Sequence, residues 1–513
     1  MQTISQALGS LTASRIHGIR RGVEKESLRT LPNGALATTP HPKALGSALT
    51  HANITTDFSE SQVELITGVH AGVQDCLDEL TQVQQATMRA LGDEMLWVSS
   101  MPCRLPEDDA IPLGQFGTSN VGRAKTVYRM GLGYRYGRRM QTISGIHYNW
   151  SLPDVSSEQY FGLIRNFRRH AFLLLYLFGA SPAVCSTFVA GRQHQLQALN
   201  DHTMYLPYAT SLRMGRLGYQ SDAQATLAVS YNSLQGYGSS LQEALTQAYP
   251  AYEAIGLRGA DGAYRQLATS LLQIENEFYG TIRPKRVIFP GERPLHALRE
   301  RGVEYVEVRL MDLDPFETVG INAQTMRFLD VFLLHCLLND SPPDSPEEIV
   351  ALAHNQHSVA ERGREPGLLL ERGSDSGTGA ITLKRWGMQL VEQLAPIAQT
   401  LDAAHGGTDY SAAVQAAMHG LQHPETLPSA RVLKAITEEF DGSFGAFARA
   451  QSIVTRQAML DMPLSTEAQA RFEALARKSW DAQRKIEAAD TMPFDIYLQE
   501  YLSHKRLGMA RAD

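Results

Sequence analysis

The chain has 513 residues and a slightly acidic composition, with a formal net charge of −7 and a pI of about 6.2. Hydrophobic residues make up 43% of it and charged residues 20%, which is typical of a globular protein with a large core. The acidic balance argues against general nucleic-acid binding, which usually requires a basic surface.

The cysteines and the N-terminal sequence indicate the cellular compartment of the protein. Four cysteines, Cys76, Cys103, Cys185 and Cys336, are widely spaced and form no C-x-x-C pair. In a chain of this length they favour reduced, mostly buried thiols in a reducing compartment. The first twenty residues lack a basic start followed by an apolar run, so we expect no signal peptide and a cytoplasmic protein.

The first predicted strand, RRGVEKESLRT over residues 20–30, carries two acidic residues two positions apart. In an extended chain Glu24 and Glu26 lie on the same face. A solvated edge strand explains two like charges side by side, and so does a bound cation. This stretch alone leaves both explanations open.

The segment 55–67, TTDFSESQVELIT, adds more carboxylates. If it is extended throughout, Glu60 and Glu64 share one face and Asp57 stands at its entry. Valine and leucine then occupy the opposite face. The segment therefore predicts another strand with an acidic side.

Two later segments, 145–153 and 302–312, alternate between apolar and polar residues, which predicts strands with one face on the core. Their polar faces are unusual in carrying His147 in the first segment and Glu307 and Arg309 in the second. The apolar positions are Ile146, Tyr148, Trp150 and Leu152 in the first segment, and Val306, Val308 and Leu310 in the second.

Residues 171–190 contain no charge and are long enough to cross a membrane. Gly179 and Pro182 interrupt them, however, and no second such segment follows. We therefore expect a buried helix, a turn, and a buried strand or loop, and no association with a membrane.

The predicted strands concentrate in residues 15–315, and residues 316–513 are mostly helical. We expect one integrated α+β domain over residues 1–513, with no flexible linker and with surface loops at 361–380 and 405–408. The helical segments predicted by periodicity are 322–339, 383–404, 409–421, 429–439, 443–461 and 465–489.

If the predicted strands join one sheet, its polar face gathers several carboxylates and one imidazole. The carboxylates of such a group repel one another, so either their pKa values rise or bound cations hold them together. Oxygen ligands with one imidazole suit Mg²⁺, or Mn²⁺, better than zinc. The predicted metal ligands are Glu24, Glu26, Asp57, Glu64, His147 and Glu307.

Arginines and tyrosines supply donors for anionic substrates. Cations bound by carboxylates beside arginines are typical of phosphoryl transfer, which depends on positioning and charge neutralisation. The chain has no G-x-x-x-x-G-K-[ST] loop and no G-x-S-x-G or H-E-x-x-H motif. We therefore expect that ATP, if it binds, is held on a sheet through metal ions.

The sequence resembles a known family, the gamma-proteobacterial class of glutamate–cysteine ligases. The resemblance covers nearly the whole chain in order. Its motifs include GVEKESLR (22–29), FGTSNVGRAKTVYR (116–129), MQTISGIHYNWSLP (140–153), YLPYATSLRMGRLGY (205–219), LQIENEFYGTIRPKRV (272–287), GVEYVEVRLMDLDPF (302–316) and EAADTMPFDIYL (487–498).

The resemblance implies a glutamine-synthetase-like fold, in which a curved antiparallel sheet forms a funnel surrounded by helices. It also implies a reaction: ATP phosphorylates the γ-carboxylate of L-glutamate, and the amine of L-cysteine attacks the acyl phosphate. γ-Glutamylcysteine, the first intermediate of glutathione synthesis, then leaves with ADP and phosphate. The family further suggests a monomer.

The resemblance also assigns roles to particular residues. Arg309 would stabilise the transferring phosphoryl group, and Lys285 would lie near the nucleotide phosphates. The acidic residues and His147 would hold the metal ions. Arg129 and Arg213 would grip substrate carboxylates. The residues that would line the cysteine pocket are Phe58, Tyr128, Leu132, Gln141, Tyr219 and Tyr279.

Two other readings stay open. A related carboxylate–amine ligase with a different amine substrate would keep the metal site and differ only in the pocket. A non-catalytic nucleotide or amino-acid sensor would be expected to lack a metal carboxylate or Arg309, and the chain retains all of them.

Overall fold

The computed structural model describes residues 8–218, 223, 227, 229–372 and 379–508. Within these residues the largest sheet has seven strands, and every neighbouring pair in it is antiparallel. The strand order is β2 (Ile54–Thr56), β3 (Gln62–Ile66), β1 (Arg20–Thr30), β5 (Ile146–Ser151), β10 (Tyr305–Met311) and β9 (Ile282–Lys285), and β4 (Met95–Leu96) also pairs with β1.

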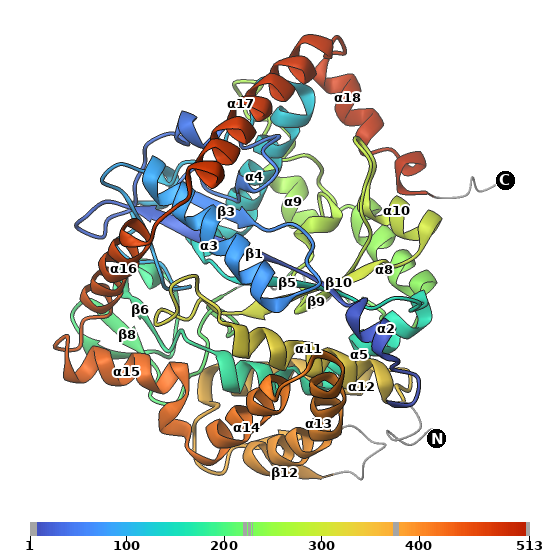
Figure 1. Ribbon diagram of the computed structural model, residues 1–513. Coiled ribbons are helices and arrows are strands. Elements are labelled where there is room, and N and C mark those ends of the chain that lie inside the picture. Colours follow the sequence, from blue (N-terminus) through green and yellow to red (C-terminus); the bar gives the residue numbers. More distant parts are fainter. Residues whose placement is uncertain (1–7, 219–222, 224–226, 228, 373–378, 509–513) are drawn as a thin grey trace.

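Two smaller antiparallel sheets accompany it in the described part of the chain. They are β6 (Ala183–Cys185), β8 (Thr203–Tyr205) and β7 (Gln197–Asn200), and the pair β11 (Leu369–Glu371) and β12 (Ala380–Thr382). The helices surround the sheets (Figure 1). They are α2 (Ala13–His17), α3 (Val73–Ala90), α4 (Asn120–Tyr136), α5 (Ser157–Phe178), α6 (Ser186–Val189), α8 (Leu234–Thr246), α9 (Pro250–Ile255), α10 (Pro294–Arg301), α11 (Ala323–Leu338), α12 (Pro346–Arg362), α13 (Leu383–His405), α14 (Asp409–Gln422), α15 (Pro428–Glu438), α16 (Phe444–Asp461), α17 (Thr466–Ala489) and α18 (Phe494–Tyr501).

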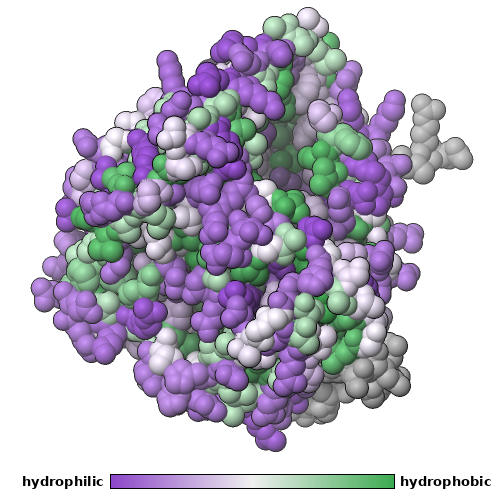
Figure 2. Space-filling model, in the orientation of Figure 1, coloured by the Kyte–Doolittle hydropathy of each residue, from purple (hydrophilic) through white to green (hydrophobic). Residues whose placement is uncertain are grey.

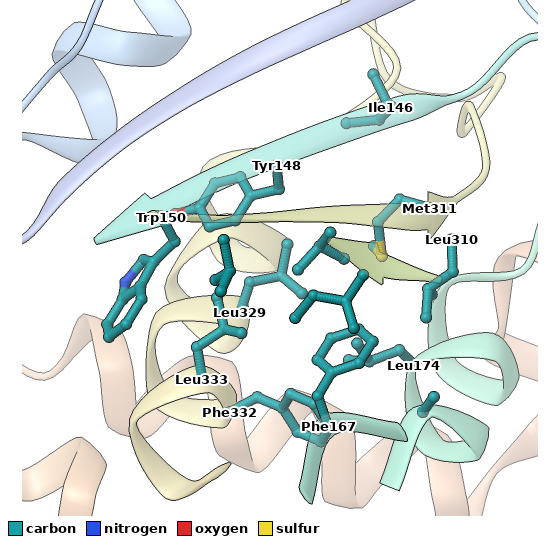
Figure 3. Close-up of a cluster of buried hydrophobic side chains, with 14 of the residues drawn as sticks. Ile146, Tyr148, Trp150, Phe167, Leu174, Leu310, Met311, Leu329, Phe332 and Leu333 are labelled. Carbon is teal, nitrogen blue, oxygen red and sulfur yellow. The ribbon is translucent and has the colours of Figure 1, made fainter. Parts of the chain in front are cut away.

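The predicted alternation along β5 and β10 is confirmed, and so is an antiparallel α+β architecture. Tyr148, Trp150 and Leu310 point to the same side of the sheet, where they pack on α5 and α11 (Figure 3). Phe167 of α5 and Phe332 of α11 pack edge to face there, with ring centroids 5.7 Å apart. This apolar layer leaves the opposite face of the sheet to the polar residues.

The segment 55–67 is not one strand, contrary to the prediction. It forms β2 and β3, which pair with each other, and the chain turns between them. Glu60 lies in that turn, and its carboxylate accepts hydrogen bonds from the backbone N–H groups of His41, at 2.9 Å, and Gln115, at 2.8 Å. It therefore does not share a face with Glu64, because the turn breaks the two-residue period.

Residues 171–190 form the predicted buried helix, turn and strand, as α5 and β6. Gly179 allows the turn, since a Cβ there would lie 2.6 Å from the carbonyl oxygen of Leu175 and 2.7 Å from that of Thr210. In the described part of the chain, no helix combines the length and apolarity needed to span a membrane.

The predicted helices after residue 316 are confirmed as α11 and α13–α17, with ends within two residues of those expected. The prediction of a surface loop over 361–380 is wrong in part, because β11 and β12 form a hairpin there. Residues 373–378 lie outside the described residues. The loop predicted at 405–408 lies between α13 and α14.

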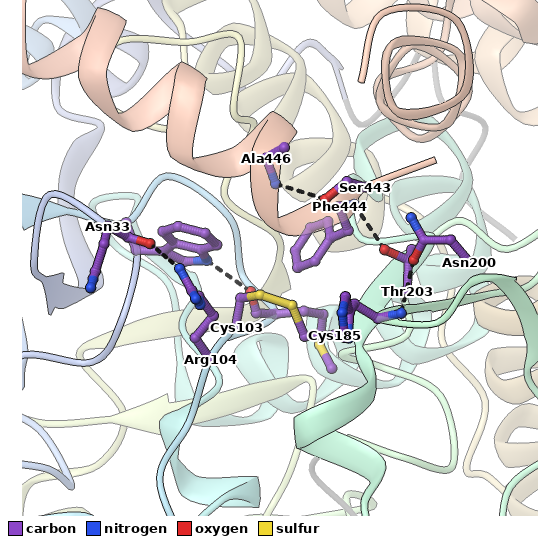
Figure 4. Close-up of a disulfide and its surroundings, with 12 residues drawn as sticks. Asn33, Cys103, Arg104, Cys185, Asn200, Thr203, Ser443, Phe444 and Ala446 are labelled. Carbon is purple, nitrogen blue, oxygen red and sulfur yellow. Dashed lines mark hydrogen bonds between the residues drawn. A yellow bond between two sulfur atoms is a disulfide. The ribbon is translucent and has the colours of Figure 1, made fainter. Parts of the chain in front are cut away.

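The expectation of four reduced cysteines is also wrong. Cys103 and Cys185, 82 residues apart in the sequence, form a disulfide beside the N-terminus of α16 (Figure 4). Cys103 follows β4, and Cys185 ends β6, so only the folded arrangement of these strands brings the two sulfurs together. Cys76 and Cys336 are free and buried, as expected.

A buried ion pair ties the sheet to the helices beneath it. The guanidinium of Arg21 on β1 lies 2.9 Å from the carboxylate of Asp330 on α11, and neither side chain is more than 1% exposed. The hydroxyl of Tyr148 donates to the same carboxylate at 2.8 Å. Removing one partner of such a pair leaves the other charge buried in the core without a counter-charge.

We expect Asp330→Asn to lower the free energy of unfolding by about 3–5 kcal/mol, because it leaves the charge of Arg21 buried without a counter-charge. Urea denaturation followed by circular dichroism measures this loss. The control is Asp409→Asn, whose partner Arg327 lies at the surface, with 23% and 64% of the two side chains exposed. The control should change stability by less than about 1 kcal/mol. Equal effects of the two substitutions would contradict this role of the buried pair.

Candidate active site

A cleft of about 420 Å³ lies over the polar face of the large sheet. Strands β1, β3, β5, β9 and β10 form its floor, and α4 and α18 form parts of its walls. Figure 2 shows this face of the molecule hollowed between α17 and α18. Nearly all predicted site residues line the cleft, namely Glu24, Glu26, Asp57, Phe58, Glu64, Tyr128, Arg129, Leu132, Gln141, His147, Tyr279, Lys285, Glu307 and Arg309.

Strand register brings the acidic residues together. Glu26 on β1 is directly opposite Glu64 on β3, and Glu24 is directly opposite His147 on β5. Glu307 follows on β10, the neighbour of β5 on the other side. Residues directly opposite in antiparallel strands have Cβ atoms about 5 Å apart, so the pairing itself forces these side chains into contact.

The imidazole of His147 lies among three carboxylates. Its Nδ1 is 2.9 Å from Glu24 Oε2 and 3.7 Å from Glu307 Oε1, and its Nε2 is 3.5 Å from Glu26 Oε1. One ligand atom each from Glu24, Glu64 and His147 lie within 4.8 Å of one another. These atoms are close enough to share one ion.

Crowding and burial shift the carboxyl groups of this cluster. Burial raises the pKa of Glu26 to about 8, and the charge of Asp57 adds to the rise. Burial also raises the pKa of Glu64 well above its usual value, with repulsion from Glu24 adding to it. Both groups therefore hold protons more tightly than ordinary glutamates, which is the behaviour of carboxylates that lack a compensating cation.

Two basic side chains border the cluster at Glu307. Lys285 Nζ is 3.3 Å from Glu307 Oε2, and Arg309 Nη1 is 3.1 Å from Glu307 Oε1. Burial would raise the pKa of Glu307, but the charges of Lys285 and Arg309 hold it well below its usual value. The side chain of Arg309 is 23% exposed, so it reaches into the cleft as well as contacting Glu307.

One wall of the cleft is mostly apolar. Tyr128 and Leu132 are one turn apart on α4, and Leu132 packs against Phe58 in the turn between β2 and β3. Nearby, the side-chain amide of Gln141 donates to the hydroxyl of Tyr279 at 2.6 Å. This wall can receive a small side chain and exclude water from it.

Arg129 lies on α4, at the edge of the acidic cluster. It donates to the backbone oxygen of Asp57, and its guanidinium lies 4.3 Å from the ring centroid of Phe116. These contacts fix the arginine at the border of the cleft. This position is compatible with the prediction that Arg129 faces a substrate.

Arg213, by contrast, does not line the cleft. It is buried, and its Nη2 donates to the backbone oxygen of Arg309 at 2.8 Å. It borders an adjoining cavity of about 320 Å³, which shares Tyr279 and Arg309 with the cleft. The other predicted residue from this region, Tyr219, lies outside the described residues.

The cleft also contains residues that the sequence patterns did not single out. Lys125 on α4 and Tyr497 and Tyr501 on α18 line it. The rings of the two tyrosines stack with centroids 5.9 Å apart. Two aromatic residues four positions apart are equally typical of any helix face that packs on a core, so this spacing does not by itself indicate that α18 borders a site.

The donor set fits a hard divalent cation. Carboxylate oxygens converge from neighbouring strands, and a single imidazole accompanies them, which suits Mg²⁺ or Mn²⁺. The raised pKa values of Glu26 and Glu64 are a second sign, since the nearby arginines do not fully offset the burial and mutual repulsion of these groups. The residues that could hold such ions are Glu24, Glu26, Asp57, Glu64, His147 and Glu307.

We expect Glu64→Gln to raise the melting temperature of the metal-free protein at pH 7 by about 2 °C or more. Burial raises the pKa of Glu64 well above its usual value, so keeping this carboxyl in the folded state costs stability above pH 4.5, and an amide does not titrate. The substitution should also reduce the further rise that millimolar Mg²⁺ produces in the wild type. Differential scanning calorimetry with and without Mg²⁺ measures both effects.

Glu60→Gln is the matched control for this prediction. Its carboxylate binds two backbone N–H groups outside the cluster, so the substitution should lower the melting temperature and keep the response to Mg²⁺. A Glu64→Gln protein that is less stable than the wild type, with an unchanged Mg²⁺ response, would contradict a cation site at Glu64.

The sequence is similar to proteins of one known family. The model of the family described as glutamate-cysteine ligase matches residues 6–359. The chain is 47% identical over 511 residues to "Glutamate--cysteine ligase" of Saccharophagus degradans, which covers 96% of each chain. It is also 47% identical over 500 residues to the protein of that name from a Janthinobacterium species, which covers 94% of each.

Solved structures agree with this result. The crystal structure of glutamate–cysteine ligase from Francisella tularensis, in complex with AMP, has a TM-score of 0.89 and 37% identity, and covers 94% of this chain and 97% of that one. A bifunctional glutathione synthetase from Pasteurella multocida has a TM-score of 0.71 and 25% identity, and covers 91% of this chain and 57% of that one. The chain therefore belongs to the glutamate–cysteine ligase family.

Proposed function

We propose that this protein uses ATP to join the γ-carboxylate of L-glutamate to the amine of L-cysteine, which gives γ-glutamylcysteine, ADP and phosphate. The observation that carries the proposal is the convergence of acidic residues, His147 and Arg309 on one sheet face, in a chain of the glutamate–cysteine ligase family. The related crystal structure that contains AMP supports a nucleotide in this reaction.

The reaction needs an activated carboxyl group, because a carboxylate is a poor electrophile. Transfer of the γ-phosphoryl group of ATP to glutamate gives an acyl phosphate, and attack by the amine then releases phosphate. Arg309, which reaches the cleft beside Glu307, would balance the charge of the phosphoryl group during transfer. Lys285, which contacts the other carboxylate oxygen of Glu307, would contact the nucleotide phosphates.

The acidic cluster would hold the divalent cations, Mg²⁺ or Mn²⁺, which neutralise phosphate charge in reactions of this kind. The protein's own contribution is to fix the ligands before substrates arrive. Glu24 is held by His147 and by the amide of Asn149, which donates at 3.0 Å. Glu26 accepts a hydrogen bond from the backbone N–H of Gly145 at 2.8 Å.

The apolar wall would receive cysteine. Tyr128, Leu132 and Phe58 would cover its small side chain, and the paired Gln141 and Tyr279 would supply polar contacts. Exclusion of water by this wall protects an acyl phosphate from hydrolysis before the amine attacks. We assign the grip on substrate carboxylates to Arg129, in the cleft, and to Arg213, in the adjoining cavity.

We further propose a monomer that acts in the cytoplasm as one catalytic domain over residues 1–513. Support for one domain comes from the main buried cluster, which draws residues from Leu11 to Phe472. The cytoplasm supplies ATP and both amino acids. The disulfide of Cys103 and Cys185 would then meet a reducing environment, although both residues are buried.

ADP release by the purified protein tests the function directly. The protein is given Mg-ATP and L-glutamate with and without L-cysteine, and the product is identified by mass. We expect release that depends on cysteine, and the mass of γ-glutamylcysteine. ADP release with another amine but not with cysteine would show that the assignment of the cysteine pocket is wrong. No ADP release with any amine would refute the proposed ligase activity.

Arg309→Lys should lower kcat at least tenfold and change the KM values less, because lysine keeps the charge but loses the planar fork of donors. Steady-state kinetics with each substrate varied in turn measures both constants. Arg362→Lys is the control, since Arg362 is 56% exposed and pairs with Glu365 at the surface. A kcat equal to that of the wild type would assign Arg309 a structural role.

A further inference from the structure

Three helices on the apolar side of the large sheet bring together a group of side chains unrelated to the cleft. His170 lies on α5, and His335 and Cys336 lie on α11. Helix α13 packs against α11 and contacts α5 through Trp386. One ring nitrogen of each histidine and the sulfur of Cys336 lie within 4.8 Å of one another. Two imidazoles and a thiol form a ligand set of a different kind from the carboxylates of the cleft.

The two histidines carry nitrogen atoms that the described part of the chain leaves without a partner. His335 is 1% exposed, and its Nε2 lies 3.1 Å from the side-chain oxygen of Gln393 on α13. Because that oxygen only accepts, Nε2 carries the proton and Nδ1 presents a lone pair. Nδ1 of His335 and Nδ1 of His170 are both buried, with no hydrogen-bond partner among the described residues. Buried polar atoms of this kind need an explanation.

The surrounding contacts hold the group in place. Asn166, one turn before His170 on α5, donates to the backbone oxygens of Cys336, at 3.0 Å, and Asn339, at 3.1 Å. This fixes α11 against α5. Trp386 of α13 packs edge to face on His170, with ring centroids 6.3 Å apart. A histidine that binds a metal through one ring nitrogen typically has its other nitrogen in a hydrogen bond, as His335 has with Gln393.

We propose that His170, His335 and Cys336 bind one soft monovalent metal ion, Cu⁺. The thiol proton leaves to water on binding, and two neutral imidazole nitrogens and one thiolate then surround the ion. Thiolate and imidazole are ligands for soft and borderline ions, whereas Mg²⁺ requires oxygen. This site is separate from the proposed function and does not depend on it.

Charge favours Cu⁺ over Zn²⁺ at this position. Cys336 belongs to the main apolar cluster of the protein, where an unbalanced charge is costly. Cu⁺ with one thiolate has no net charge, whereas Zn²⁺ would leave one positive charge in the core. Further positive charge lies nearby, since Arg372 lies over the ring of Trp386, which itself packs on His170.

The geometry allows the ion to bind without rebuilding the fold. Metal–nitrogen and metal–sulfur bonds of about 2.0–2.3 Å place three ligand atoms roughly 3.5–4 Å apart, so modest side-chain rotations are sufficient. His335 and Cys336 are buried, but His170 is only partly buried and gives access from its side of the group.

An anaerobic titration of the full chain with Cu⁺, in competition with bicinchoninate, tests the proposal. Excess Mg²⁺ is present to occupy the carboxylates. We expect one Cu⁺ per wild-type chain, and an affinity at least a hundredfold weaker in Cys336→Ser. Cys76→Ser is the matched control, because Cys76 is the other free, buried cysteine, and it should bind Cu⁺ like the wild type.

His335→Gln provides a second variant in case Cys336→Ser does not fold, as judged by near-ultraviolet circular dichroism. It should weaken Cu⁺ binding as well, and ADP release should persist in each folded variant. Unchanged Cu⁺ affinity in a folded Cys336→Ser or His335→Gln protein would overturn the proposal. So would loss of binding in Cys76→Ser, or retention of Zn²⁺ in preference to Cu⁺.

Discussion

Repulsion between carboxylates on adjacent strands is the constraint on which the rest of the site depends. Glu26 and Glu64 are directly opposite each other, an arrangement that destabilises an antiparallel pair. Basic groups offset part of this repulsion: His147 contacts Glu24, and Lys285 and Arg309 contact Glu307. The charge of Arg129 also acts against the rise in the pKa of Glu64. The pKa of Glu64 nevertheless stays well above its usual value, so a divalent cation bound there would stabilise the group further.

The opposite face of the same sheet supplies the stability that this acidic face lacks. Alternation along β1 places Arg21 and Val23 beneath the sheet while Glu24 and Glu26 lie above it. Arg21 is paired with Asp330, and Tyr148 and Trp150 pack on the helices α5 and α11. The strands are thus held rigidly from below, which allows the residues above to keep positions that repel one another.

Alternation in the sequence was enough to predict β1, β5, β10 and the convergence of their polar side chains, because a period of two depends only on local geometry. It failed at residues 59–61, where short polar side chains suit a turn as well as a strand, and Glu60 was misplaced as a result. The pairing of Cys103 with Cys185 and the position of Tyr497 in the cleft depend on packing between distant segments, which periodicity does not report.

Anomalous scattering from crystals grown with Mn²⁺ would show whether the acidic face of the sheet binds divalent cations. We expect anomalous peaks among Glu24, Glu64, His147 and Glu307, with Mn²⁺ bound by oxygens of the glutamates. Crystals at millimolar Mn²⁺ with no peak in the cleft, and with the carboxylates paired to Lys285 and Arg309 instead, would contradict this expectation.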